Sequence, residues 1–581
     1  MDNLMFLLSR RSLRLPWAQA PSLRADALRC SPYATQWDVH DVGLQLICWL
    51  NMLPRISNPS NPIHKRITWF QDPCEAFAPS TEHQLVAGHP LAIGGYHCQI
   101  RPRYVVAGAA PAIATVNERT ATPEVEAMRA RAASDMNWFR VPPKVYFKGG
   151  SLEVALAELN GLRRAFIVTD KKLFDMDYAN RVSSILDTMH IQSQVFYQVS
   201  SDPTSESVLA GVKELRDFKP DVIIAVGGGS PIDAAKAMRY MHERPGQSLS
   251  ELAMSCTGSG QRSREQEAGA GSVPIICIPT TSGTGSEVTP FATITDPATA
   301  RKYTLADYAL TPSMAVVDPQ LVINLPAQQT AYGGMCTIAH ALESYISVFA
   351  SDYSRGLSKH ALTMVSRYAA RAYQRGNSDM HAREKMHNAA TVAGMAAANT
   401  FLGINHGLAS ELASTFQVNT GLAKGLLILP VMRLMLRDRG VMEALAELAQ
   451  HLKLGGSTQQ EQAQAVLTWV AQCKADMNIP TSIQSVLGAN KGAVFMAQTQ
   501  AMSMGALKDA HAIASPVQAT MQELEDLLHQ AWVAGAVHPG GDGGGGLALG
   551  RAWALGLAWE RWHVVVEGAH RHHLLSSVCC S

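Results

Sequence analysis

The stretch DVIIAVGGGSP, residues 221–231, decides the fold. An apolar strand over 222–226 runs directly into Gly227, Gly228 and Gly229, and a helical pattern follows. Glycines lack a Cβ, so the backbone can bend sharply there and approach a ligand closely. Pro231 suits a first helical turn, whose free N–H groups and dipole attract anions. The stretch predicts a strand–turn–helix unit that holds a pyrophosphate, with an ordinary strand–helix turn as the alternative.

A second polar loop, PTTSGTGSEVT at 279–289, follows another predicted strand, 273–278. Ligands of open α/β sheets bind at the carboxyl ends of parallel strands, and both loops begin at such ends. We therefore predict one dinucleotide site that uses hydroxyls of both loops and a carboxylate early in the first helix. Besides the three glycines, its predicted residues are Ser230, Asp233, Thr280, Thr281, Ser282 and Thr284.

Asp170 ends a further predicted strand, 165–169. A carboxylate at this place accepts a hydrogen bond from a ribose hydroxyl and repels the extra phosphate of NADP. The position favours NAD, although an aspartate that caps the following helix stays open as the alternative.

The wider pattern places these loops in the first of two domains. Further strands are predicted at 144–147 and 194–199, and helices at 151–160, 173–190 and 204–217. This alternation is typical of a parallel sheet covered on both faces, a Rossmann-like α/β nucleotide-binding domain over 143–326. The pattern from 327 to 534 predicts an all-helical domain. Its helices are expected at 327–349, 355–374, 380–401, 404–417, 421–436, 441–453, 459–476 and 519–532.

Composition narrows the class of protein. The 581 residues are 47% hydrophobic and 17% charged, which is typical of a globular protein with a large core. A net charge of +1 gives no electrostatic reason to bind nucleic acid. No segment reaches the roughly 18 to 20 apolar residues that cross a bilayer, so we expect no membrane partner. Ten scattered cysteines indicate reduced thiols inside a cell.

The two ends differ from the middle. Residues 1–120 show no sustained period, and their arginine-rich start is compatible either with an organelle transit peptide or with an unstructured segment. We therefore expect a cytoplasmic or organellar location. A linker helix is predicted within 121–142, with its pattern at 124–138, and a glycine-rich, low-complexity tail over 535–581. The histidines and cysteines of the tail leave adventitious metal binding open. Patternless ends around a regular middle also leave a mosaic gene product open.

The motifs together resemble the iron-containing alcohol dehydrogenases, above all the alcohol dehydrogenase half of bifunctional aldehyde-alcohol dehydrogenases. The resemblance covers roughly 143–532 and includes GGGSPIDAAKAM at 227–238, PTTSGTGSEVTPFATITD at 279–296 and HALESYIS at 340–347. It implies a divalent metal between the two domains and hydride transfer between NAD(H) and a primary alcohol or aldehyde. It also places Lys302 against the cofactor and makes a homo-oligomer the expected state. Residues 1–120 do not resemble the aldehyde-forming domain, so that second activity is not expected.

The metal positions break the family pattern. The resemblance places metal ligands at 336, 340, 406 and 420, where this sequence has Cys336, His340, His406 and Thr420. The family has a further histidine near the substrate, and this sequence has Ser410 at that position. In one interpretation Cys336, His340 and His406 form a three-ligand site for iron or zinc, with His340 and His406 as the catalytic residues. In the others the metal is lost, or a weak site is completed by water or a nearby side chain.

Two functional hypotheses follow. The first is an NAD-dependent oxidoreductase for short-chain primary alcohols and aldehydes, with activity in doubt because two of the family ligands are replaced. The second is a nucleotide-binding pseudoenzyme that acts as a structural or regulatory subunit. Both hypotheses have to explain why the glycine loops are intact while the set of metal ligands is altered.

Overall fold

A computed structural model describes residues 139–249, 251–252, 272–298 and 301–533. The predictions for 1–120 and 535–581 therefore lie outside the described residues. So does most of the predicted linker helix, of which only 139–142 are described and are irregular.

The first part of the described chain is built on a six-stranded sheet in the order β1-β8-β5-β4-β2-β3. Each neighbouring pair is parallel, so the predicted α/β class is confirmed. The sequence did not predict β8, whose four residues are too few to show a period. The strands are β1 (Lys144–Phe147), β2 (Arg164–Asp170), β3 (Gln192–Val199), β4 (Val222–Gly227), β5 (Ile275–Pro279) and β8 (Met314–Val317).

Alternate side chains of the central strand β4 point to opposite faces of the sheet. Val222, Ile224 and Val226 pack in one cluster, and Ile223 and Ala225 in another. The first cluster is covered by α5 (Ser151–Leu156) and α7 (Tyr178–Thr188), and the second by α8 (Ser205–Phe218) and α9 (Gly229–Glu243). Because both faces are buried, β4 is apolar throughout, as a central parallel strand should be.

Two local features differ from the prediction. The expected helix 173–190 is two helices, α6 (Lys171–Asp175) and α7, because Asp177 between them adopts a left-handed backbone conformation with φ of 62°. An antiparallel hairpin, β6 (Phe291–Asp296) and β7 (Arg301–Ala306), follows the second polar loop. It was not predicted, because its threonine-rich strands carry no clear alternation of apolar residues.

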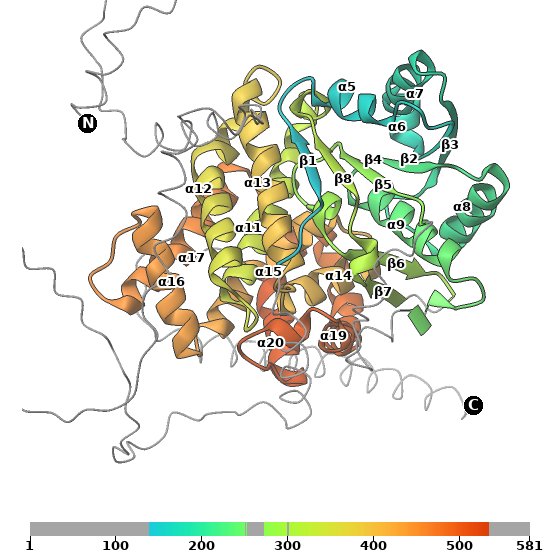
Figure 1. Cartoon of the computed structure of the whole chain (residues 1–581). Helices are drawn as coiled ribbons and strands as arrows, with labels where there is room; N and C mark the ends of the chain where they lie inside the picture. The colour runs from blue at the N-terminus through green and yellow to red at the C-terminus, as the bar shows by residue number, and fades with distance from the viewer. Residues whose placement is uncertain (1–138, 250, 253–271, 299–300, 534–581) are drawn as a thin grey trace, which may run out of the picture. The chain divides into compact units, whose positions relative to one another are not determined.

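The second part of the described chain contains no strand after Ala327, so the predicted all-helical class is right. The short α18 and the long α19 were not predicted, because the sequence of α19 mixes methionine, glutamine and glycine without an amphipathic stripe. Figure 1 shows these helices, which are α11 (Ala327–Ile346), α12 (Asp352–Arg375), α13 (Met380–Ala398), α14 (Ile404–Phe416), α15 (Thr420–Met435), α16 (Arg439–Leu452), α17 (Gln459–Asp476), α18 (Ile483–Leu487), α19 (Gly492–Lys508) and α20 (Met521–Val533).

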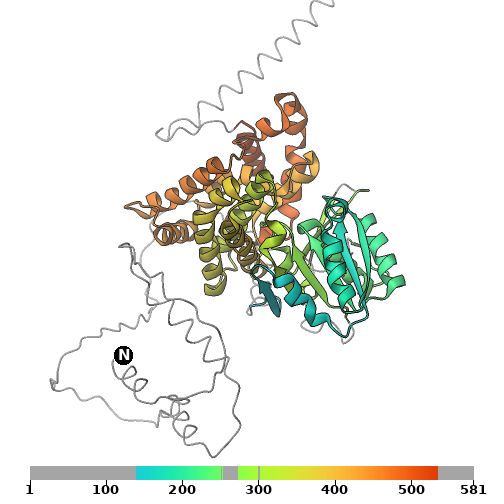
Figure 2. The ribbon, with the colours of Figure 1, turned by 90° about the horizontal axis from the view of Figure 1, so that it is seen from above.

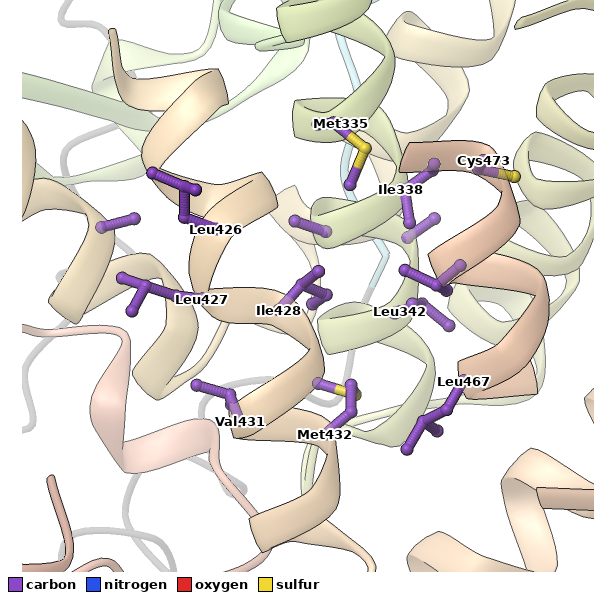
Figure 3. Close-up of a cluster of buried hydrophobic side chains, with 14 of the residues drawn as sticks. Met335, Ile338, Leu342, Leu426, Leu427, Ile428, Val431, Met432, Leu467 and Cys473 are labelled. Atoms are coloured by element: carbon purple, nitrogen blue, oxygen red, sulfur yellow. The ribbon is translucent and has the colours of Figure 1, made fainter. Parts of the chain in front are cut away.

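The core of the helical part lies between α11, α15 and α17. Ile428 and Met432 of α15 point toward α11, which contributes Met335 and Leu342, and Leu467 of α17 belongs to the same cluster (Figure 3). Figures 1 and 2 both show the sheet and the helices side by side, and α13 contacts β8 of the sheet. Residues 336 and 340 lie on α11, so this core fixes the place of the predicted metal ligands.

No helix within the described residues is long and apolar enough to cross a membrane.

Candidate functional site

The two predicted nucleotide loops lie against each other. The backbone N–H of Thr280 donates to the carbonyl of Gly227, at 2.9 Å. A Cβ on Gly228 would lie 3.2 Å from Cγ2 of Thr281, and one on Gly229 would lie 3.0 Å from Cγ2 of Thr284. At these distances an added Cβ would require Thr281 or Thr284 to move by a few tenths of an ångström. The structure thus brings together the loops that the sequence placed in one site, at the N-terminus of α9.

The second loop is also fixed to the helical part. A Cβ on Gly333 of α11 would lie 2.3 Å from the carbonyl oxygen of Ser282. Gly285 has a left-handed φ of 67°, and its Cβ position lies 2.6 Å from Cα of Gly394 in α13. Because glycine meets glycine across this boundary, backbone packs directly on backbone. The hydroxyl of Ser282 is hydrogen-bonded to Nδ1 of His387 in α13, at 3.0 Å. This predicted cofactor-binding residue therefore also connects the loop to the helical part.

Lys236 is a buried residue that ties α9 to the end of the second loop. Its ammonium donates to the carbonyls of Ser286, Thr289 and Phe291, the last two at 2.7 and 3.0 Å. Burial lowers the pKa of Lys236, and nearby Asp233 opposes this effect. The sequence analysis missed this role, because a lysine in a helix usually faces solvent and nothing in the motif shows that this one does not.

Ser230 and Asp233 have partners within the fold. The hydroxyl of Ser230 donates to the carbonyl of Ser201, at 2.7 Å. The Asp233 carboxylate accepts from the backbone N–H of Thr293, at 3.2 Å, and burial raises its pKa. Asp233 therefore connects α9 to the hairpin β6–β7. Its predicted contact with the cofactor stays a prediction.

Asp170 and Lys302 also have partners within the fold. One carboxylate oxygen of Asp170 accepts from the backbone N–H of Leu173, at 2.9 Å, and so caps α6. The capping alternative is thus realised, while the other carboxylate oxygen has no recorded partner among the described residues. Lys302 of β7 forms an ion pair with Asp202, at 3.1 Å, and its charge also acts on His406.

The side chain of Lys424 contacts two of the predicted metal ligands, Cys336 and His340. Cys336 and His340 lie one turn apart on α11, with Sγ and Nε2 separated by 3.6 Å. The ammonium of Lys424, from α15, is hydrogen-bonded to this same Nε2 and lies 3.8 Å from Sγ. Lys424 is only 2% exposed. The sequence analysis did not single out Lys424, because GLAKGLL reads as an ordinary helical stretch.

Thr420, on the fourth family position, is exposed at the start of α15. Lys424 lies one turn further along the same helix, and residues four apart share a face. Ser410, at the position of the further family histidine, is buried within α14. The side chain that approaches Cys336 and His340 is therefore Lys424.

After burial, the charge of Lys424 has the largest effect on the pKa values of the residues around it. Burial and the Lys424 charge hold the pKa of His340 well below its usual value, while a backbone group of Thr284 opposes them. Burial and Lys424 likewise hold the pKa of His406 far down. Burial raises the pKa of the Cys336 thiol, against the effect of Lys424. Both histidines are thus neutral at physiological pH, and the effect of Thr284 places the nucleotide loop next to His340.

A buried carboxyl group positions His406. The Oε1 atom of Glu343 accepts from the backbone N–H groups of Asn405 and His406, at 3.0 and 3.3 Å, where α14 begins. Burial raises the pKa of Glu343 to about 7, although Lys424 opposes the shift. The pattern of the sequence contained no signal for this role, because HALESYIS does not show which side of α11 the glutamate takes.

The predicted ligand set Cys336, His340 and His406 does not fit a divalent cation. A metal at this place needs the lone pair of His340 Nε2, which is engaged by the ammonium of Lys424. It would also have to lie beside a fixed positive charge. The ring centroids of His340 and His406 are 6.3 Å apart. The three-ligand interpretation is therefore not supported by the geometry.

A different group among the described residues has ligand atoms close together. His406, Asp509 and His511 offer ligand atoms that all lie within 4.8 Å of one another. The backbone N–H of Leu402 donates to Nδ1 of His511, at 3.1 Å, so the lone pair lies there and Nε2 carries the proton of the neutral ring. A metal on His511 would have to break this hydrogen bond. Burial raises the pKa of Asp509 to about 6.

Comparison with known proteins agrees with this architecture. The pattern of the family "Iron-containing alcohol dehydrogenase" matches residues 142–319, and that of "Fe-containing alcohol dehydrogenase family, C-terminal" matches 330–532. The solved alcohol dehydrogenase from Oenococcus oeni is 26% identical, with a TM-score of 0.62 over 68% of this chain and 100% of that one. A solved 1,3-propanediol oxidoreductase is 28% identical, with a TM-score of 0.61 over 68% and 99%.

Two curated relatives extend the comparison. The bifunctional aldehyde-alcohol dehydrogenase of Escherichia coli K12 is 40% identical over 416 residues, which are 69% of this chain and 46% of that protein. The chain thus spans about half the length of this relative. The NADPH-dependent butanol dehydrogenase of Clostridium saccharobutylicum is 32% identical over 67% of this chain and 96% of its own length. Sequence, fold and loops agree with one another, and the chain belongs to the iron-containing alcohol dehydrogenase family.

Proposed function

We propose that this protein is an NAD-dependent oxidoreductase that interconverts short-chain primary alcohols and aldehydes. One observation carries the proposal. The contact of Gly228 and Gly229 with Thr281 and Thr284 makes a narrow phosphate cradle at the N-terminus of α9, and the same loop packs on Gly333 of α11, the helix that carries His340. A dinucleotide whose pyrophosphate lies in this cradle can present its nicotinamide toward the buried cluster.

The chemistry of this arrangement is a hydride transfer. In the reducing direction bound NADH would supply a hydride, with its electron pair, to the carbonyl carbon of an aldehyde. The carbonyl oxygen would take up the π electrons and a proton from water, which gives the alcohol. The chain contributes the position of both reactants, because the second loop is fixed to α9 by Lys236 and to α13 by Gly394.

NAD rather than NADP is proposed because of Asp170. Its second carboxylate oxygen is free to accept from a ribose hydroxyl while the first caps α6. The Clostridium relative is by its name NADPH-dependent, so the two cofactors have to be compared directly. Asp170→Asn keeps an oxygen for the cap and removes the charge, and should narrow the preference for NADH over NADPH.

The full-length protein tests this function. NADH binding is measured by titration of its fluorescence, and turnover by NADH oxidation with acetaldehyde and butanal as probes. Gly229→Ala should weaken NADH binding by about tenfold, because its Cβ meets Thr284. Gly356→Ala is the matched control, since nothing lies within 4 Å of that Cβ. A folded protein that binds neither NADH nor NADPH would overturn the proposal.

A second candidate is a nucleotide-binding pseudoenzyme that acts as a structural or regulatory subunit. The observation that favours it is Lys424, which engages the lone pair that the family ligand set would offer to a metal. NADH binding without turnover of any aldehyde would select this candidate. We also propose self-association, which light scattering of the purified protein would test.

A further inference from the structure

We infer that the ammonium of Lys424 takes the place of the divalent cation in this member of the family and is the electrophile for the substrate oxygen. The juxtaposition that supports this inference is the group Lys424, Cys336 and His340. The inference rests on the proposed function and names the group that would polarise its carbonyl. It departs from a metal mechanism, because the chain itself supplies the positive charge.

The first argument is that the ammonium and a metal would need the same atoms. A cation bound by His340 uses the lone pair of Nε2, and Lys424 donates a hydrogen to this lone pair. Its nitrogen also lies 3.8 Å from Sγ of Cys336. A neutral His340 is the form that accepts from an ammonium, and burial favours that form. Lys424 and a divalent ion therefore exclude each other at these two residues.

The second argument concerns the surroundings of the charge. A buried ammonium is stable only where lone pairs or negative charges surround it. Besides Cys336 and His340, two carboxyl groups belong to the same cluster. Glu343 accepts from the backbone N–H of His406, and the carboxylate of Asp509 lies within 4.8 Å of ring nitrogens of His406 and His511. These two carboxyls, a thiol and the neutral histidines are the kind of environment that holds a cation. Lys424 is the cation that occupies it.

The third argument is that one N–H of the Lys424 ammonium remains available for a ligand. An ammonium has three N–H donors, and His340 and Cys336 are the acceptors recorded for Lys424 among the described residues. One donor remains for a ligand. The nucleotide loop packs through Gly283 on Gly333 of α11, the helix that carries Cys336 and His340, so a carbonyl between the nicotinamide and this group would receive the remaining N–H. As the hydride adds to the carbonyl carbon, the oxygen gains negative charge, and a fixed ammonium in a dry site stabilises it.

The experiment uses the full chain and three measurements. The first is metal content after anaerobic incubation with iron(II) or zinc(II) and desalting. The second is NADH-linked aldehyde reduction with and without EDTA. The third is chemical rescue, in which propylammonium is added to Lys424→Ala, whose truncated side chain leaves space for it. Sodium chloride at equal ionic strength is the control for rescue, and Lys424→Met is a second variant with nearly unchanged side-chain length.

We expect the wild-type protein to retain no stoichiometric metal and to be insensitive to EDTA. Lys424→Met and Lys424→Ala should lose about 100-fold or more in kcat, with NADH affinity within about twofold of wild type. Propylammonium should restore part of the activity of Lys424→Ala and none of that of Lys424→Met. NADH affinity and circular dichroism show separately whether a variant is folded and binds its cofactor.

Three results would overturn the inference. One is a metal retained by the wild type and released by Cys336→Ala. Another is a metal released by Asp509→Asn, which would assign it to His406, Asp509 and His511. The third is full activity of Lys424→Met. If the wild type binds no NADH, or binds it without turnover, the proposed function has failed first. Metal uptake by Lys424→Ala then decides whether Lys424 excludes an ion, because unchanged uptake would overturn the inference as well.

Discussion

Three buried lysines show how differently this fold treats one kind of charge. Lys236 is surrounded by backbone carbonyls, and Lys424 by a histidine and a thiol. Lys474, near the end of α17, is only 7% exposed and has no carboxylate within ion-pair distance among the described residues. Burial, and to a lesser degree Arg433, lower its pKa to about 8. Of the three, Lys474 is thus the one whose charge should destabilise the native state.

Lys474→Met should therefore stabilise the protein near neutral pH. Between about pH 8 and 10.5 the unfolded chain binds more protons at this residue than the folded one, so stability rises with pH there. The stabilisation by Lys474→Met should reach up to about 3 kcal/mol below pH 8 and shrink as the pH approaches 10. Urea unfolding of both proteins at several pH values measures it. The exposed Lys508→Met is the control, and a pH-independent difference for Lys474→Met would contradict the expectation.

At single residues, sequence reasoning found the glycines of the cradle but not the cation. Glycine and serine are common in ordinary turns, so what indicated the site was that two such runs each follow a buried strand directly. Lys424 was missed because its role depends on the distance between α15 and α11, which are separated in the sequence. Cys336 was read as a ligand, since spacing alone cannot show that another side chain has already reached His340.

Among the elements, the loop 279–289 has the most constrained surroundings. It follows β5, meets the turn before α9, and rests through Gly283 and Gly285 on Gly333 of α11 and Gly394 of α13. Each of these contacts brings backbone against backbone, so no side-chain rotation can relieve an added atom. The position of this loop is therefore determined by both parts of the protein at once.

Gly333→Ala should displace the loop, because its Cβ would lie 2.3 Å from the carbonyl oxygen of Ser282. We expect a loss of about 1–3 kcal/mol in the free energy of unfolding and weaker NADH binding. Gly356→Ala in the exposed part of α12 has free space around its Cβ and should instead stabilise by about 0.5–1 kcal/mol. Thermal unfolding and NADH titration of both variants measure these effects. An unchanged NADH affinity in Gly333→Ala would show that the loop does not need this contact.

Most elements with a clear apolar pattern were predicted from the sequence. The strands around 222–226 and 275–279 and the helices from α11 to α17 have clear periods, since one or both of their faces are buried. The hairpin β6–β7 and α19 were missed, because their burial depends on neighbours that only the tertiary structure supplies. Lys302 was placed by family resemblance, while its strand could not be predicted.

In the molecule as a whole, a ligand bound at the sheet should also stabilise the neighbouring helices. The hydroxyl of Thr391 in α13 donates to the Glu287 carboxylate at 2.6 Å, and α11 touches the same loop through Gly333. α16 and α17 lie on the side of the helical part away from the sheet (Figure 1). The loop thus joins the nucleotide cradle to the nearer helices only.

NADH should therefore slow amide hydrogen exchange in 279–289, in the first turns of α11 and in the middle of α13. Exchange in α16 and α17 should stay unchanged, which makes these helices an internal control. Binding lowers the population of locally opened states wherever the ligand stabilises contacts. Exchange by mass spectrometry with and without NADH measures this. Protection confined to the α/β part would mean that the two parts respond independently.

The positive charge of this site belongs to a side chain of the protein itself. An ion must be acquired from the surroundings, competes with other ions, and is present in some copies of a protein and missing from others. A lysine side chain is made with the chain, so every folded copy carries its charge, and the supply of iron or exposure to oxygen does not alter that number. With Lys424 in this position, the total activity of this protein in a cell would depend on how much protein is made and not on the supply of metal ions.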